Sequence, residues 1–294
     1  MATYSIKDLE HLSGIKAHTI RIWEKRYKLI NPSRTATNIR YYNDDNLRQL
    51  LNIAVLSKNG IKISKIIKLS DAELADKVLL FTQNVNRLDS VIESLIISML
   101  ELDENKFDRY LSNIIINLGF EEAFIKILLP FFERVGFLWQ TGAILPAHEH
   151  FVSNMIRQKL IVAIDNHKDQ NLNKKNQFLL FLPEGEMHEL SLLFCQYLLI
   201  KRGFKVYYLG QSLPYSNLQN LNHSCTFDYI LTILTMPIPE NKMKKFIDEL
   251  SSSFSQVTIF IAGPQLATLS FKIPSNILQI NSHQEFIEQI DKLD

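Results

Sequence analysis

The sequence predicts a multidomain α and α/β protein: a winged helix-turn-helix, a four-helix bundle and a doubly wound parallel sheet of Rossmann-like type. Three observations predict it. The chain opens with short, basic helical patterns, continues with long helical patterns rich in Leu, Ile and Phe, and ends with short apolar runs that alternate with amphipathic helices. A chain of 294 residues can form several cores. We place the domains at residues 1–75, 76–172 and 173–294.

The charge of the chain is unevenly distributed. Its formal net charge is +1, yet residues 1–70 hold 13 Lys and Arg against 5 Asp and Glu. The first 70 residues therefore carry a net +8 and the remainder −7. A basic amino-terminal module on an acidic body is typical of a nucleic-acid reader joined to a sensor domain.

Composition also limits the compartment and the class of protein. The two cysteines, Cys195 and Cys225, lie in apolar surroundings, which favours neither a disulfide framework nor a thiolate metal site. No signal peptide opens the chain, and no apolar run reaches membrane-spanning length. We expect a protein of the reducing cytoplasm with no membrane partner.

The first module has the pattern of a helix-turn-helix. Ser5–Leu12 and His18–Tyr27 are predicted helices, and a Gly-containing turn separates them. Ile20 and Trp23 form the buried face of the second helix, the one that enters the major groove in such motifs. The DNA-contacting candidates on its outer face are His18, Thr19, Arg21, Lys25 and Arg26. The alternative is that these charges form only a solvated helix face.

Two short extended pieces after the second helix predict a wing that holds the phosphate backbone. Its candidate contacts are Arg34, Arg40 and Tyr41. Asn38 is expected at the turn between the two pieces, because Asn tolerates a positive φ. A third helix, Asp44–Asn59, ends before Gly60.

These motifs resemble the MerR family of winged-helix transcription regulators. The resemblance covers about residues 1–75 and rests on Trp23-Glu24-Lys25-Arg26-Tyr27, Pro32-x-Arg34-Thr35, Arg40-Tyr41-Tyr42 and the helix Asp44–Asn59. It implies binding of a homo-oligomer to near-palindromic, double-stranded promoter DNA. The metal-sensing branch of the family uses cysteines after the third helix. None occurs here before Cys195, so direct thiolate sensing is not expected.

The middle segment predicts four helices between Val91 and about Asn166, with breaks at Leu118-Gly119, Pro130 and Gly142–Pro146. Trp139 precedes the last break, and Glu149 and His150 follow it. Taken alone, Trp139 fits a core aromatic equally well, and His150 fits a hydrogen-bonded core histidine.

The last segment alternates strands with helices and predicts a parallel sheet with ligands at the carboxyl ends of its strands. The expected strands are Phe178–Leu182, Val206–Leu209, Tyr229–Leu234, Thr258–Ala262 and Ile277–Ile280. The expected helices are Leu190–Arg202, Ser216–Asn222, Asn241–Ser253 and Gln284–Leu293. No Gly-rich phosphate fingerprint occurs in this segment, which makes a nucleotide ligand less favoured.

The loop after the first of these strands carries Glu186 and His188. An imidazole at this edge can offer one ring nitrogen to a metal while Glu186 accepts a hydrogen bond from the other. The alternative is an ordinary surface histidine on a βα loop.

Three motifs in this segment resemble the cobalamin-binding domain of methionine synthase. They are Glu186-x-His188-x-x-Ser191, Thr232-Ile233-Leu234 and Ala262-Gly263, at spacings that fit the pattern Asp-x-His-x-x-Gly, Ser-x-Leu and Gly-Gly. The resemblance implies a bound cobalamin, adenosylcobalamin or another corrinoid, with His188 as the lower ligand of cobalt. The slot for the nucleotide tail would involve Ser191, Thr232, Leu234, Ala262 and Gly263. Two glycines of the pattern are lost, which could narrow this slot.

The whole domain order resembles the MerR-type, cobalamin-dependent photoreceptor regulators. That resemblance implies that Trp139 covers the upper face of the corrin and that Glu149 and His150 lie near the upper axial group. In those regulators the light response uses a histidine directly after the Trp, where this chain has Gln140. Amide nitrogen is a poorer cobalt ligand than imidazole, so light sensing stays an open question.

The leading hypothesis is a non-enzymatic transcription regulator, with repression the commoner outcome in the family. A corrinoid held between helical cap and sheet would control its assembly, as homo-dimer or homo-tetramer, and its operator affinity. One alternative is a regulator whose sensor domain binds no cobalamin. Another is a corrinoid methyl carrier or mutase subunit, against which the fused winged helix argues.

Overall fold

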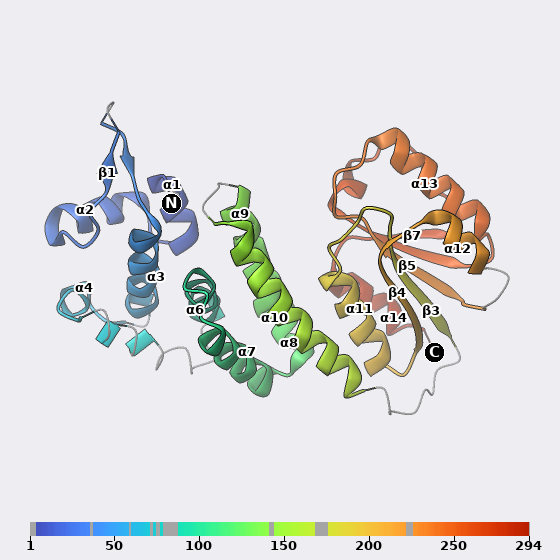
Figure 1. Cartoon of the computed structure of the whole chain (residues 1–294), viewed down its shortest axis with the longest axis horizontal. Helices are drawn as coiled ribbons and strands as arrows, with labels where there is room; N and C mark the ends of the chain where they lie inside the picture. The colour runs from blue at the N-terminus through green and yellow to red at the C-terminus, as the bar shows by residue number, and fades with distance from the viewer. Residues whose placement is uncertain are drawn as a thin grey trace. The chain divides into compact units, whose positions relative to one another are not determined.

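The computed structural model describes residues 4–35, 38–58, 60–70, 73–74, 77–78, 88–140, 144–167, 176–221 and 226–293. The chain forms two compact units, residues 1–155 and 156–294. The boundaries expected after residues 75 and 172 lie outside the described residues, as does Cys225. Figure 1 shows the elements of each unit. Among the described helices, none is both long and apolar enough to cross a bilayer.

The first unit opens with the predicted helix-turn-helix. Helix α1 spans Ile6–Ser13 and α2 spans Ala17–Tyr27. Ser5 and Asp8 cap α1 reciprocally: each side chain accepts a hydrogen bond from the other's backbone N–H. The turn begins at Gly14, whose φ of 67° suits glycine, and α2 buries Ile20 and Trp23 against the module.

The predicted wing follows. Strands β1 (Ser33–Arg34) and β2 (Arg40–Tyr41) pair antiparallel, and Asn38 has a φ of 66° as expected for its turn. Helices α3 (Asp44–Lys58) and α4 (Ile63–Ile66) follow the wing.

The described bundle has four helices as expected, but two of their boundaries differ: the break expected at Pro130 is absent, and an unpredicted break at residues 101–103 separates the first two helices. The bundle comprises α6 (Leu88–Leu100), α7 (Glu104–Leu118), a third continuous helix and α10 (Pro146–Asp165). The third helix runs through α8 (Phe120–Ala123), a π-helical turn η1 (Phe124–Leu128) and α9 (Leu129–Gln140). Pro130 lacks the N–H of an α-helical hydrogen bond, and the wider π turn just before it lets the helix continue.

The second unit contains the predicted parallel sheet, with strand order β4-β3-β5-β6-β7. Its strands are β3 (Gln177–Pro183), β4 (Lys205–Leu213), β5 (Tyr229–Ile233), β6 (Thr258–Ala262) and β7 (Ile277–Ile280). Its helices are α11 (Leu190–Lys201), α12 (Tyr215–Leu221), the 3-10 helix η2 (Pro264–Thr268), α13 (Glu240–Ser253) and α14 (His283–Ile290).

Helices cover both faces of the sheet, α11 and α14 on one and α12 and α13 on the other (Figure 1). From β3 the chain first moves outward to β4 and then returns to β5 on the other side of β3. The switch point therefore lies between the carboxyl ends of β3 and β5, which is where open α/β sheets bind ligands.

Candidate functional site

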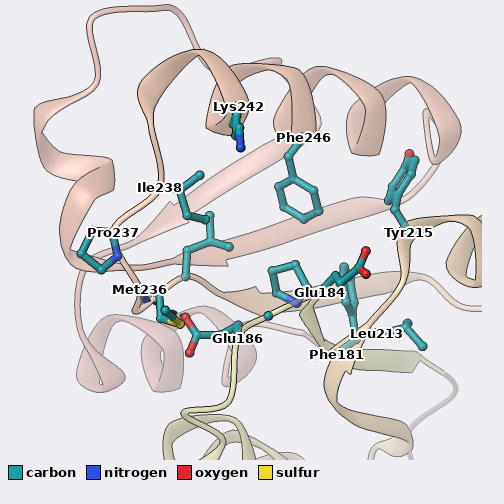
Figure 2. A pocket seen from close by; sticks show the side chains of 13 residues that line it. Phe181, Glu184, Glu186, Leu213, Tyr215, Met236, Pro237, Ile238, Lys242 and Phe246 are labelled. Carbon is teal, nitrogen blue, oxygen red and sulfur yellow. Dashed lines mark hydrogen bonds between the residues drawn. The ribbon is translucent and has the colours of Figure 1, made fainter.

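Glu186 joins the two loops that leave the switch point. Its side chain is buried, and its Oε2 accepts hydrogen bonds from the backbone N–H groups of Thr235 and Met236, each at 2.7 Å. Its Oε1 accepts from the backbone N–H of His188 at 3.0 Å and lies 2.6 Å from the ring Nδ1. Figure 2 shows Glu186 next to Met236. One carboxylate thus fixes the β3–α11 loop, the β5–α13 loop and the imidazole between them.

The hydrogen bonds also decide the charge of this carboxylate. Burial alone would raise the pKa of Glu186, but hydrogen bonds from the backbone of Met236 and from His188 outweigh burial and hold the pKa below its ordinary value. Glu186 is therefore ionised at neutral pH and accepts from the Nδ1–H of His188. This fixes the tautomer of His188 and leaves Nε2 as the atom that can bind a metal.

The surroundings of His188 suit a metal that arrives with other ligands already in place. The His188 side chain is 60% exposed. Within the described parts of the chain, no group of three or more His, Cys, Asp or Glu side chains could hold a metal ion. One imidazole alone is a poor site for a bare ion, but it can supply a single axial ligand to a metal held by a macrocycle.

A cavity of about 460 Å³ opens on the α11–α14 face at the carboxyl ends of β5, β6 and β7. Ser191, Ala262 and Gly263, three of the residues that the resemblance assigns to the tail slot, line it. Leu231, Ile233 and other apolar side chains form much of the remaining wall. The cavity is open with the side chains of Ser191 and Ala262 in its wall. Its size falls within the usual range for a bound organic group.

The structure places Thr232 and Leu234 away from this cavity. Side chains alternate along β5, so Leu231 and Ile233 face the cavity, and Thr235 beyond the strand end also lines it. Leu234 belongs instead to the core under α12 and α13. Thr232 is fully buried, and its Oγ1 has no hydrogen-bond partner in the structure.

Gly263 has a structural role in addition to its place in the cavity wall. A Cβ atom at this position would lie 2.2 Å from the backbone oxygen of Leu234. The backbone N–H of Leu234 donates to the Ala262 carbonyl at 2.8 Å, which draws the two segments together. Only glycine permits this approach.

A second cavity, of about 350 Å³, lies on the α13 face of the same sheet edge. Figure 2 shows Phe246 and Lys242 of α13 above it and Phe181 below. Glu186 forms part of its wall. The Glu186 carboxylate therefore contacts His188 and also forms part of the wall of the largely apolar cavity on the α13 face.

Glu189, directly after His188, is a site residue that the sequence analysis missed. It is buried, accepts a hydrogen bond from the Arg157 Nε of α10, and accepts another from the Tyr208 hydroxyl at 3.0 Å. Burial first, and then the charge of Glu189, raise the pKa of Tyr208. These contacts hold the start of α11 in place beside His188. The sequence signal that could have identified Glu189 is its position, as a carboxylate between a loop and the start of an apolar helix.

The other three predicted cofactor residues lie at one end of two bundle helices in the first unit. Trp139, near the end of α9, is 57% exposed. Near the start of α10, Glu149 accepts a hydrogen bond from the Ser153 hydroxyl at 2.6 Å and lies 3.0 Å from the Nδ1 of the exposed His150. Neither Trp139 nor His150 is a core residue, and both are accessible to a ligand. The side chain of Gln140 lies outside the described residues.

The predicted DNA-contacting residues lie together on the reader module. His18, Arg21, Lys25 and Arg26 of α2 and Arg34 of the wing are exposed, while Thr19, Arg40 and Tyr41 are half-buried. Arg34 donates to the Asn38 side chain at 2.6 Å.

Glu24, which the sequence analysis did not single out, connects the wing to α2. It accepts a hydrogen bond from the Tyr42 hydroxyl, and it lies 3.2 Å from the Nε of Arg40. Burial and the adjacent Glu24 raise the pKa of Tyr42. Wing and recognition helix are therefore fixed as one surface.

Comparison with known proteins identifies the reader module and the helical bundle. Residues 4–73 match the family described as MerR HTH family regulatory protein, and residues 91–163 match the B12 binding domain. The HTH-type transcriptional repressor CarH of Myxococcus xanthus is 30% identical over 224 residues, which cover 74% of this chain and 73% of CarH. The chain belongs to this family of MerR-type regulators with a B12 binding domain. CarA of the same organism is 26% identical to the regulator over 219 residues, 74% of this chain and 71% of CarA.

The fold has a counterpart among solved structures. The monomethylamine corrinoid protein of Methanosarcina barkeri superposes on the regulator with a TM-score of 0.55. The match covers 69% of this chain and 98% of that protein, at 14% sequence identity. The B12 binding domain match coincides with helices α6 to α10, the bundle that precedes the sheet.

Proposed function

We propose that the regulator is a cytoplasmic transcriptional repressor whose operator affinity is set by a corrinoid bound through His188. The observation that carries the proposal is the Glu186–His188 pair, whose Nε2 faces away from the carboxylate at the switch point of the sheet. A cavity at the same sheet edge would hold the nucleotide tail. The chain belongs to a family of MerR-type regulators with a B12 binding domain, which supports a corrinoid as the ligand.

Each residue has a distinct part in holding this ligand. His188 would supply the imidazole nitrogen that binds cobalt, and Glu186 keeps its ring in one tautomer and one orientation. The wall formed by Ser191, Ala262 and Gly263 would enclose the tail. Trp139 is a large exposed aromatic of the kind that packs on a flat conjugated ring, and Glu149 and His150 lie at the same helix ends. When bound, a corrinoid would supply a cobalt centre with an exchangeable ligand.

On the DNA side, α2 would read the major groove while Arg34, Arg40 and Tyr41 hold phosphates. Two-fold symmetry of a dimer or tetramer would match a near-palindromic promoter site. A ligand shifts an equilibrium only by its different affinity for the two states. The corrinoid must therefore bind one assembly state more tightly than the other to change repression.

The test is an absorption spectrum after purified protein is mixed with adenosylcobalamin in the dark and freed of unbound ligand. We expect the wild type to retain the corrinoid and His188→Ala to lose it or change its spectrum. His167→Ala is the matched control, because the Nδ1 of His167 contacts the Ala163 carbonyl on α10, outside the site. A wild type that retains no corrinoid would leave a winged-helix regulator that answers to another signal.

Gel shifts with promoter DNA, with and without the corrinoid and in light and dark, then test the control of DNA binding. Light scattering distinguishes a dimer from a tetramer. The methyl-carrier alternative predicts turnover of a methyl donor with the corrinoid bound. Corrinoid-dependent DNA binding without turnover would exclude it.

A further inference from the structure

One fully buried charge in the first unit belongs to neither proposed binding surface. Glu93, on bundle helix α6, has a side chain with no solvent exposure. Its Oε1 accepts a hydrogen bond from the Nζ of Lys58 at 2.6 Å, while its Oε2 has no hydrogen-bond partner in the structure. Lys58 is the last residue of α3 in the reader module. The pair therefore connects the DNA-binding module to the helical bundle.

The same lysine contacts the turn of the helix-turn-helix. A Cβ atom at Gly14 would lie 3.3 Å from the Lys58 Nζ, so the ammonium group lies directly against this turn. The turn is otherwise tied to α1: Gly14 donates to the Glu10 carbonyl at 2.8 Å, and Ala17 donates to the Glu10 carboxylate at 3.1 Å. α2 begins at Ala17, and the side chain of its cap residue Lys16 makes no capping hydrogen bond but pairs with Glu10 at 3.1 Å. Lys58 is thus the link from Glu93 to the start of the recognition helix.

The Lys58–Glu93 pair is not expected to add much to the stability of the folded protein. Burying a charge costs several kcal/mol, about as much as the attraction of its partner returns, so apolar replacements of buried ion pairs are often neutral or stabilising. Burial raises the pKa of Glu93 despite the opposing charges of Lys58 and Arg134, which shows the cost of burying this carboxylate. What the pair does provide is a directional hydrogen bond at a fixed place.

We propose that Lys58 and Glu93 are positioning residues through which the helical bundle holds the helix-turn-helix in its DNA-binding geometry. The inference extends the proposed function, because it names the path from the B12 binding domain to the DNA reader. It requires DNA binding by the first module, but it does not require that a corrinoid is the signal.

The decisive variant is Glu93→Leu in the full-length protein. Leucine fits a helix and removes the buried charge, while Lys58, with 32% of its side chain exposed, can turn to solvent. The probe is a labelled duplex of about 30 base pairs, selected from a random pool by the wild type and long enough for two half-sites. We expect the melting temperature to stay equal or rise and the DNA affinity to fall by about tenfold. A purely structural role would move both measurements in the same direction.

Two further variants sharpen the result. Lys58→Arg keeps the charge and the hydrogen bond to Glu93, so it should bind DNA within about threefold of the wild type. Lys106→Met removes a more exposed ion pair, Lys106–Glu101 at 2.8 Å, and should change neither measurement.

Wild-type DNA affinity in Glu93→Leu at every salt concentration would overturn the inference. Loss of affinity together with a lower melting temperature would also overturn it, since the pair would then be structural. Corrinoid retention, measured from the absorption spectrum, separates this inference from the proposed function. A wild type that retains no corrinoid removes the proposed ligand and leaves the comparison of DNA affinities intact.

Discussion

Glu186 shows how one carboxylate can determine the properties of a metal ligand. It accepts hydrogen bonds from three backbone N–H groups and from the ring of His188. In Glu186→Gln the amide nitrogen cannot accept these bonds, so the ring loses its fixed orientation. Because loss of such a supporting group typically weakens a metal ligand by about 10–100-fold, we expect corrinoid affinity to fall by that factor. Spectroscopic titration with aquocobalamin measures it, and unchanged affinity would show that Glu186 does not orient His188.

The pKa of Glu186 makes the same contact dependent on pH. A carboxyl group whose pKa is lowered by folding stabilises the folded state above its unfolded pKa, and it loses that contribution as the pH falls through the folded pKa. We therefore expect the wild type to exceed Glu186→Gln in unfolding free energy by a constant amount above about pH 5, and the difference to shrink below about pH 4. Urea unfolding at several pH values checks this. A difference that grows in acid would contradict the assigned direction.

The alternation of side chains along β5 and β6 leads to a paired prediction for the cavity. Ala262→Leu should fill part of the cavity and abolish corrinoid retention with little effect on folding. Thr232→Val should leave retention unchanged. It should also stabilise the protein by about 1 kcal/mol, because it removes a buried hydroxyl without a hydrogen-bond partner. Corrinoid titration and thermal unfolding test both variants. Loss of binding in Thr232→Val alone would show that the expected Thr232-Ile233-Leu234 register is the functional one.

The elements themselves could be predicted, because helical and strand periodicities are local. The five strands, the wing turn at Asn38 and the pair Glu186–His188 all occur where the sequence places them. The helix break predicted at Pro130 was wrong, because whether a proline ends a helix depends on the turn before it, and here that turn is π-helical. The face on which Thr232 lies depends on the register of its strand against its neighbours, which a motif does not contain.

Contacts between distant parts of the chain were the least predictable feature. The Lys58–Glu93 pair joins residues 35 positions apart, and Tyr42–Glu24 joins residues 18 apart. Each partner taken alone resembles an ordinary charged or polar helix or strand residue. Only the packed structure shows that the Glu93 carboxylate is fully buried and that the Glu24 carboxylate fixes the wing to α2.

At the scale of the whole chain, the uneven charge suggests how a sensor could control a reader. The basic first 70 residues can bind DNA phosphates, while the acidic remainder is repelled by them. Each phosphate contact contributes about 0.9 to the slope of log affinity against log salt, so the slope counts contacts. A ligand that changes assembly alters how many reader modules touch one DNA molecule. A ligand that changes only the geometry of each module alters affinity at a constant number of contacts.

The slope therefore distinguishes the two forms of control. If the corrinoid acts through assembly, the salt slope for promoter DNA should differ by about twofold between the corrinoid-bound and corrinoid-free protein. Arg34→Ala calibrates the measurement, because loss of one phosphate contact per module should reduce the slope by about 1 for each module bound. Fluorescence anisotropy across a salt series gives both values. Equal slopes with different affinities would exclude assembly as the switch and place the response inside each module, where Lys58 and Glu93 connect bundle and reader.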